Sequence, residues 1–128
     1  MLSFDITDRF VASKFYFKEL IDKKLTLEEL LKYPFVLLSP ITHGRKNFDM
    51  FIRSHNKNFK PTYEFNSYSL CRDLIKNGFG IGIGNPIHYP LDKFIIIDTD
   101  FELPKRTFNI GYIKNSKNQL IKDFIDLL

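Results

Sequence analysis

The sequence has few of the residues that mark secreted, metal-binding or membrane-spanning proteins. It contains one cysteine, Cys71, one alanine and no tryptophan among its 128 residues. A single thiol excludes an intramolecular disulfide and a zinc site built from several cysteines. No apolar run approaches the length of about 20 residues that a membrane-spanning helix requires. Residues 1–10 contain Asp5, Asp8 and Arg9 and lack the apolar core of a signal peptide, so we expect a cytoplasmic protein without membrane contact.

Patterns that indicate catalysis or metal binding are also missing. The three histidines, His43, His55 and His88, form no pair at the i, i+4 spacing of a helical metal site. No spaced set of serine, histidine and carboxylate indicates a nucleophilic triad. Cys71 falls on the apolar face of a predicted helix, which favours a buried, inert thiol over a redox sensor. We therefore expect no catalytic residues, no metal, no cofactor and no enzymatic activity.

The residues that are present suit one soluble globular domain. Apolar residues make up 44% of the chain and charged residues 27%, and fourteen phenylalanines with six tyrosines can fill a sizeable core. The formal net charge is +4, and the densest basic stretch is 43–60, where five lysines and arginines face only Asp49. We interpret this stretch as a solvated helix face, and a nucleic-acid-binding surface is the alternative.

Hydrophobic patterning predicts strands that alternate with helices. Polar and apolar residues alternate over 2–6, as in a half-buried strand, and the apolar runs 35–38 and 94–97 predict strands buried on both faces. Thr26 and Glu29 form a capping box for a short helix. Further helices are predicted over 45–55, 67–77 and 116–128, and further strands over 61–65, 80–84 and 107–113. The predicted fold class is α/β, with a mixed, largely parallel sheet flanked by helices.

Three stretches of the sequence combine helix, strand and turn signals in a definite order. Residues 25–38 have the pattern of a short helix, then Pro34, then an apolar strand. Residues 67–86 have the pattern of a serine-capped helix, then a Gly-x-Gly-Ile turn, a strand and a proline. The third stretch has the pattern of a strand over 107–113 followed by a final helix over 116–128. In their order and spacing, and over nearly the whole chain, these stretches together resemble the effector-binding domain of LysR-type transcriptional regulators.

The resemblance implies one lobe of a type II periplasmic-binding-protein-like domain, which senses a small polar or anionic effector in the cleft between two lobes. The chain, residues 1–128, resembles a single partial effector-binding domain. Residues 14–100 correspond to the second lobe, and residues 1–13 and 101–128 correspond to the crossing strands and part of the first lobe. DNA contact would require a winged helix–turn–helix region that is absent from this chain. The alternatives are a solute-binding protein or an enzyme on the same fold, and a basic nucleic-acid-binding module.

Candidate ligand-binding residues lie at expected strand ends and helix starts. Ser39, Thr42 and His43 lie between a buried strand and a predicted helix, and Asn66 and Ser67 precede the next helix. Helix capping is the alternative role for the hydroxyl groups. Asn85 follows the glycine-rich strand. Because ligands of open α/β sheets bind beyond the carboxyl ends of strands, we expect these side chains to converge on one rim.

Two other patterns lead to structural predictions. The glycines at 78, 80, 82 and 84 follow a helix and precede a strand, whereas the dinucleotide fingerprint needs the opposite order. They therefore predict a turn and close backbone packing. The final predicted helix has apolar residues on one side, which predicts a homodimer with Phe124 buried. These apolar residues are Leu120, Ile121, Phe124, Ile125 and Leu128.

Overall fold

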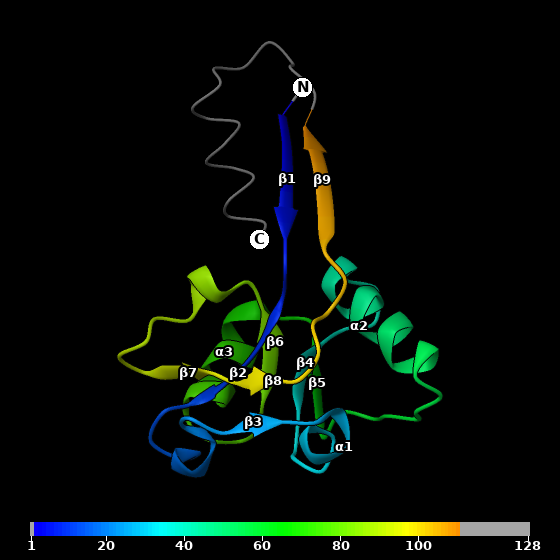
Figure 1. Cartoon of the computed structure of the whole chain (residues 1–128). Coiled ribbons are helices and arrows are strands. Elements are labelled where there is room, and N and C mark those ends of the chain that lie inside the picture. The colour runs from blue at the N-terminus through cyan, green and yellow to red at the C-terminus, as the bar shows by residue number, and fades with distance from the viewer. Residues whose placement is uncertain (1, 111–128) are drawn as a thin grey trace, which may run out of the picture.

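The first and last described strands pair with each other and form a two-stranded ribbon. The computed structural model describes residues 2–110, and of Leu2 and Ile110 only the backbone. Strand β1 (Leu2–Ile6) pairs antiparallel with β9 (Arg106–Ile110), and Ile6 lies opposite Arg106. Figure 1 shows this ribbon standing out from a lobe that holds the other described helices and strands.

The lobe contains a mixed sheet organised around β2 (Arg9–Ser13). Strand β2 pairs antiparallel with both β6 (Gly82–Gly84) and β7 (Phe94–Ile96). Strand β4 (Val36–Leu38) pairs in parallel with β5 (Tyr63–Phe65). A parallel bridge between Phe35 and Ile81 connects these two groups of strands. At one end, the short strands β3 (Lys24–Leu25) and β8 (Asp98–Thr99) also pair in parallel.

The predicted α/β class with a mixed sheet is confirmed, but the parallel share of the sheet is smaller than predicted. Among the described residues, parallel pairing joins β4 to β5 and β3 to β8, together with the bridge at Phe35. The pairs that involve β1, β2, β6, β7 and β9 are antiparallel. The reason is topological: β1 leads into β2 and β7 leads back to β9, so the entering and leaving segments run side by side in opposite directions.

The local helix signals predicted from the sequence are confirmed. Helix α1 (Leu27–Leu30) begins with the capping box, in which Thr26 Oγ1 accepts from the Glu29 N–H at 3.2 Å and Glu29 Oε1 accepts from the Thr26 N–H at 3.1 Å. The hydrogen bond from the Thr26 backbone lowers the pKa of Glu29. Helix α3 (Tyr68–Lys76) begins at Ser67, whose Oγ accepts from the Leu70 N–H at 3.2 Å. It ends at Asn77, and Gly78 follows with a φ of +82°.

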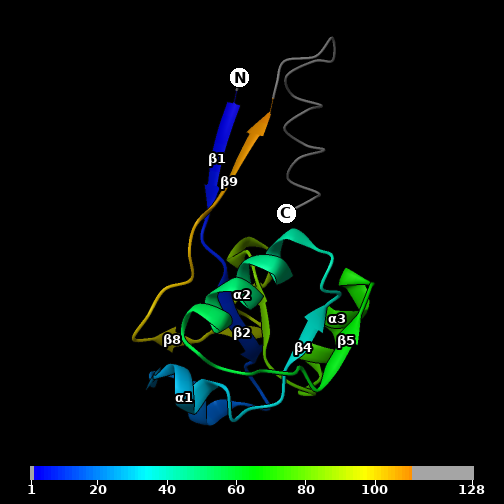
Figure 2. The same ribbon diagram turned by 90° about the vertical axis from the view of Figure 1, so that its right-hand side faces the viewer.

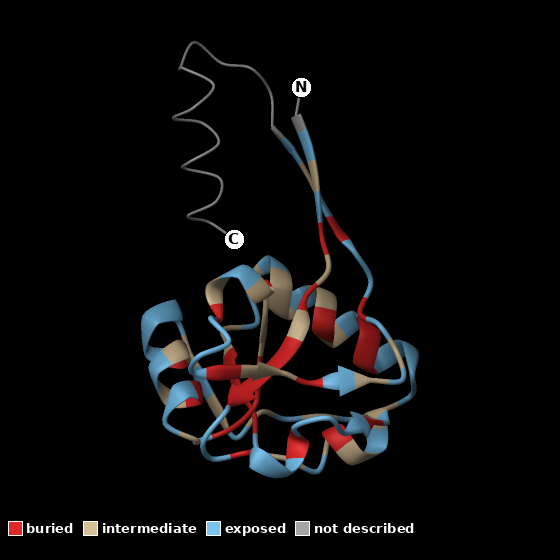
Figure 3. Ribbon diagram, turned by 60° about the vertical axis from the view of Figure 1, so that its left-hand side comes forward, coloured by how far each residue is buried: buried red, intermediate tan, exposed pale blue. Residues whose placement is uncertain are grey.

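Helices α2 (His43–Ser54) and α3 cover opposite faces of the sheet. Phe48, Phe51 and Ile52 of α2 pack in one buried cluster with Phe10 and Phe35, whereas Cys71 and Ile75 of α3 pack in another with Val11 and Val36. Successive residues of a strand point to opposite faces, so neighbouring residues of β2 belong to different clusters. Figure 2 agrees, because β4 lies between α2 and α3 in that view. Figure 3 shows that most buried residues lie in the lobe and few lie along the ribbon.

The glycines pack closely, as predicted. A Cβ on Gly80 would lie 2.8 Å from the Pro34 carbonyl oxygen, and a Cβ on Gly82 would collide with the Ile75 side chain. Cys71 is buried, as expected, and its Sγ donates to the Leu37 carbonyl at 3.6 Å. Burial raises the pKa of the Cys71 thiol, so the nucleophilic thiolate is scarce at neutral pH.

The basic stretch 43–60 is partly matched by acidic side chains. Arg45 pairs with Asp49 and Glu64, and Lys57 pairs with Glu28 at 3.1 Å. Lys46, Arg53 and Lys60 are exposed along or after α2. This arrangement is typical of a solvated helix face.

Several predictions concern residues beyond those described. The helix over 116–128 lies outside them, and so does the end of the predicted strand 107–113. The division into a lobe over 14–100 and flanking crossing strands stays a prediction, although the structure includes β2, which precedes residue 14, in the sheet of the lobe. Within residues 2–110, no helix is long and apolar enough to cross a bilayer.

Candidate ligand-binding site

A cavity of about 350 Å³ lies at the base of the ribbon, beyond the carboxyl ends of β4 and β6. This volume falls within the range of small-molecule pockets, roughly 300–1,000 Å³. The lining residues come from β4, the first turns of α2 and α3, β6, the short helix η2 (Pro86–His88) and the ribbon. They are Asp8, Leu37, Leu38, Thr42, His43, Gly44, Arg45, Phe48, Tyr68, Ile83, Gly84, His88, Arg106 and Phe108.

The start of α2 presents backbone N–H groups to this cavity. Thr42 is the N-cap residue, but its Oγ1 donates to the Ser39 carbonyl at 2.9 Å instead of capping the helix. Within the described part of the chain, no acceptor pairs with the N–H groups of His43, Gly44 and Arg45. The helix dipole adds partial positive charge at the same place, so this end of α2 favours an anionic or strongly polar group.

A buried ion pair holds Arg106 beside the helix start. Asp8 is 2% exposed and Arg106 is 9% exposed. Arg106 Nε lies 2.7 Å from Asp8 Oδ2, and its second terminal nitrogen donates to Asp8 Oδ1 at 2.8 Å. Asp8 lies between β1 and β2, whereas Arg106 begins β9, so this pair ties the entering and leaving segments together at the cavity.

The Arg106 guanidinium group also contacts the helix start and an aromatic ring. Its Nη1 lies 3.3 Å from His43 Nδ1, and its Cζ lies 5.3 Å from the centroid of the Phe108 ring. A Cβ on Gly44 would lie 3.6 Å from Arg106 Cζ, which is ordinary van der Waals contact. The Arg106 guanidinium group is therefore held in a fixed orientation beside His43 and Gly44, two of the residues with unpaired N–H groups.

Arg45 forms a second ordered arginine at the wall. Its Nη1 donates to the Leu38 carbonyl at 2.9 Å and to Glu64 at 2.7 Å, and its Nε donates to Asp49 at 2.9 Å. Burial disfavours the charged form, but the hydrogen bonds to Glu64 and Asp49 outweigh it and raise the pKa of Arg45. Its charge is therefore already matched within the protein, and its role at the wall is structural.

Aromatic side chains also line the cavity. The rings of Tyr68 and His88 meet edge-to-face with centroids 5.6 Å apart. Burial raises the pKa of Tyr68, and the neighbouring Tyr89 and Arg72 only partly oppose this effect. Tyr68 is therefore a neutral phenol at physiological pH, and a neutral phenol can donate or accept a hydrogen bond.

The structure places two of the six predicted ligand-binding residues on the cavity wall. Thr42 and His43 line it, whereas Ser39, Asn66, Ser67 and Asn85 do not. Ser39 accepts two hydrogen bonds from Thr42 at its carbonyl oxygen, and Ser67 caps α3. Asn85 is buried, and its Oδ1 accepts from the Ile87 N–H at 3.2 Å. Ligand contact stays a prediction for all six residues.

Sequence reasoning missed most of the charged and aromatic lining. Asp8 and Arg106 are 98 positions apart, so no local spacing could pair them. Tyr68 comes directly after the predicted residue Ser67, and His88 comes three positions after the predicted residue Asn85. The predicted residues therefore lie in or beside loops that border the cavity, but most of the side chains that line it were not among them.

Comparison with known proteins supports the predicted family. Residues 9–128 match the LysR substrate binding domain family. No curated protein matches the chain.

Within the described residues, no group of three or more histidine, cysteine, aspartate or glutamate side chains is arranged to hold a metal ion.

Solved structures of regulatory domains share the fold. The CcmR regulatory domain from Synechocystis, in complex with 2-PG, has a TM-score of 0.68 at 17% identity and covers 96% of this chain and 62% of its own. HinK, a LysR family transcriptional regulator from Pseudomonas aeruginosa, has a TM-score of 0.64 at 13% identity, and the match covers 98% of this chain and 46% of HinK. The effector binding domain of QuiR, in complex with shikimate, has a TM-score of 0.63 at 13% identity, with 94% and 59% covered.

These identities show a shared fold, and the chain spans only 46% to 62% of the length of the three structures. The family match, by contrast, extends over nearly the whole sequence. The chain therefore belongs to the LysR substrate binding domain family, the effector-binding domains of LysR-type transcriptional regulators.

Proposed function

We propose that this chain senses a small polar or anionic effector in the cavity at the start of α2. The observation that carries this proposal is the set of three unpaired N–H groups at His43, Gly44 and Arg45, which line the cavity beside the Arg106 guanidinium group. Asp8 neutralises Arg106 electrostatically and fixes its position, so an anion gains directed hydrogen bonds more than net charge.

The rest of the wall suits a small organic molecule. Leu37, Phe48 and Phe108 provide apolar surface, and Tyr68 adds a neutral phenol. Pockets for small molecules combine mostly apolar walls with a few polar groups that set orientation. A carboxylate or phosphate attached to a small apolar or hydroxylated skeleton therefore matches this cavity better than a bare inorganic ion.

The comparisons support the same class of ligand. CcmR was solved with 2-PG and QuiR with shikimate, and both domains share the fold of this chain. The family consists of transcriptional regulators, which favours a sensing role over the alternatives of a solute-binding protein or an enzyme. DNA binding would then belong to a winged helix–turn–helix region outside this chain.

The ribbon provides a route from ligand to regulation. Arg106 contacts both the start of α2 and Asp8, and it lies where β9 leaves the lobe. A ligand that bridges the α2 N–H groups and Arg106 would stabilise one orientation of the ribbon relative to the lobe. Binding shifts a conformational equilibrium only by this kind of differential contact.

The proposal predicts a localised response to small carboxylates. We expect shikimate to shift the backbone NMR resonances of residues 42–45 and the Arg106 side-chain signal, and inorganic phosphate to do so more weakly. Thr42→Val and His43→Gln should raise the Kd several-fold, because both side chains line the cavity. The matched control is His55→Gln at the opposite end of α2, which should leave the Kd unchanged. Equal weakening by all three variants, or shifts confined to other regions, would contradict the proposal.

We also propose that the chain forms a homodimer through its final predicted helix. The apolar residues at helical spacing, including Phe124, would be exposed in an isolated chain unless another surface covers them. Phe124→Asp should shift the chain from dimer to monomer, as measured by analytical ultracentrifugation at tens of micromolar. The control is Lys117→Asp, outside the apolar set. A wild-type chain that sediments as a monomer would refute this prediction.

A further inference from the structure

A second cavity lies where the entering and leaving segments of the chain meet the lobe. Its volume is about 170 Å³. Its wall is formed by Thr7, Asp8, Arg9 and Phe10 of the entering segment and by Asp98, Thr99, Phe101, Glu102 and Leu103 of the leaving segment. Asp8 also lines the larger cavity, so the two cavities share one buried side chain.

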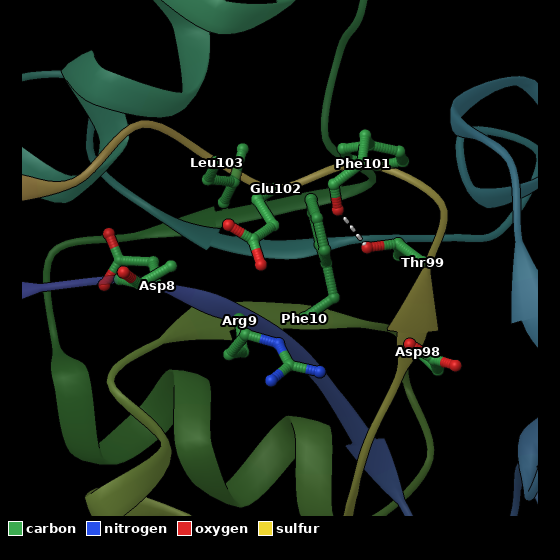
Figure 4. A pocket seen from close by; sticks show the side chains of 9 residues that line it. Asp8, Arg9, Phe10, Asp98, Thr99, Phe101, Glu102 and Leu103 are labelled. Carbon is green, nitrogen blue, oxygen red and sulfur yellow. Dashed lines mark hydrogen bonds between the residues drawn. The ribbon is translucent and has the colours of Figure 1, made fainter.

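This second cavity carries charges of both signs that the protein does not pair. Within the described residues, the side chains of Arg9, Asp98 and Glu102 make no hydrogen bond and no ion pair, either with each other or with other groups. Figure 4 shows the Glu102 carboxylate reaching into the space between Asp8 and Phe10, with the Arg9 guanidinium group below it. Asp8 cannot serve as a free carboxylate, because Arg106 already binds both of its oxygens.

Size and charge together select the ligand. At about 30 Å³ per water molecule, the cavity holds the volume of roughly six waters, which matches a molecule of about six non-hydrogen atoms. A simple anion would pair with Arg9 alone, and a simple cation would pair only with Glu102 or Asp98, whose carboxylates are exposed to solvent when no ligand is bound. A small zwitterion can satisfy both, because guanidinium groups bind carboxylates in a bidentate manner and carboxylates bind ammonium groups.

We propose that this cavity is a second ligand site for a small amino acid, with its carboxylate on Arg9 and its ammonium group on Glu102. Phe10, Phe101 and Leu103 supply apolar surface for the carbon skeleton. The bound molecule would contact the segments on both sides of the junction between ribbon and lobe. Its binding would therefore stiffen that junction and, through Asp8, reach the wall of the larger cavity.

The test is an NMR titration with three zwitterions that hold the two charges at increasing separation: glycine, β-alanine and 4-aminobutyrate. Acetate and methylammonium serve as probes that carry each charge alone. We expect at least one zwitterion to shift the resonances of residues 7–10 and 98–103 with a Kd on the order of 1 mM, as suits a ligand of so few atoms. Acetate and methylammonium should bind at least tenfold more weakly.

Variants locate the site. Arg9→Gln and Glu102→Gln should each raise the Kd of the zwitterion about tenfold, whereas Lys14→Gln and Glu19→Gln, at exposed positions outside the cavity, should not change it. Glu102 is exposed, so its substitution leaves folding intact. The proposal is overturned if acetate binds as tightly as the zwitterions, if both cavity variants bind like the wild type, or if the shifts fall on residues 42–45. The response to shikimate at residues 42–45 is read separately, so the two sites succeed or fail independently.

Discussion

Replacing Asp8 with alanine is expected to lower the free energy of unfolding by about 3–5 kcal/mol, because it leaves a buried charge without its partner. Arg106 is only 9% exposed and binds both carboxylate oxygens of Asp8. Neither His43 nor the ring of Phe108 can replace a carboxylate as a counter-charge. Urea unfolding followed by circular dichroism measures the change.

Asp5→Ala is the matched control for this prediction. Asp5 lies three positions earlier, is exposed, and accepts from Thr107 Oγ1 at 2.7 Å. Its loss should cost about 0.5 kcal/mol or less. The double variant Asp8→Leu with Arg106→Met should lose less stability than Asp8→Ala, because it removes both buried charges. Equal losses for Asp5→Ala and Asp8→Ala would show that the buried pair does not hold the ribbon to the lobe.

Replacing Phe48 with alanine is expected to cost about 3–5 kcal/mol, the usual loss when a buried phenylalanine is truncated. Phe48 is 1% exposed and contacts the rings of Phe10, Phe35 and Phe59, with centroids 5.9, 6.3 and 5.6 Å away. It also lines the larger cavity. Its loss should therefore enlarge this cavity and also lower the melting temperature, which calorimetry measures.

The surface control for this second prediction is Phe79→Ala. Phe79 is 47% exposed and contacts Tyr63 edge-to-face at 5.8 Å. We expect a loss of about 1 kcal/mol or less, since little apolar area returns to water. A loss at Phe79 that matches the loss at Phe48 would contradict the prediction that the core is centred on Phe48.

Short-range sequence signals predicted several local features of the fold. The capping box of Thr26 and Glu29, the cap at Ser67 and the turn at Gly78 each depend on residues three or fewer positions apart. The buried runs that became β4 and β7 were visible because both faces of those strands are covered. Such patterns predicted the α/β class and the positions of α1, α2 and α3, whereas the family came from the resemblance of three longer stretches.

The direction in which strands pair was decided by the tertiary structure. The apolar runs 35–38 and 94–97 predict strands, but their sequences are the same whether the neighbouring strands run parallel or antiparallel. β1 leads into β2 and the chain returns from β7 to β9, which pairs antiparallel with β1, so β2 and β7 also run in opposite directions. β6 pairs antiparallel with β2 on its other side. The share of parallel pairing was overestimated from the sequence for this reason.

The sequence by itself determined the local elements and the loops that border the larger cavity, because each depends on patterns within a few turns of helix or strand. It also indicated the family, through the order and spacing of three stretches along nearly the whole chain. Only the tertiary structure decided which side chains face the two cavities. Asp8 and Arg106 meet across 98 positions, and Arg9 and Glu102 share a wall across a similar separation, because β1 and β9 run side by side. Contacts of this range arise from how the chain crosses itself, and a linear pattern of residue types contains no record of that crossing.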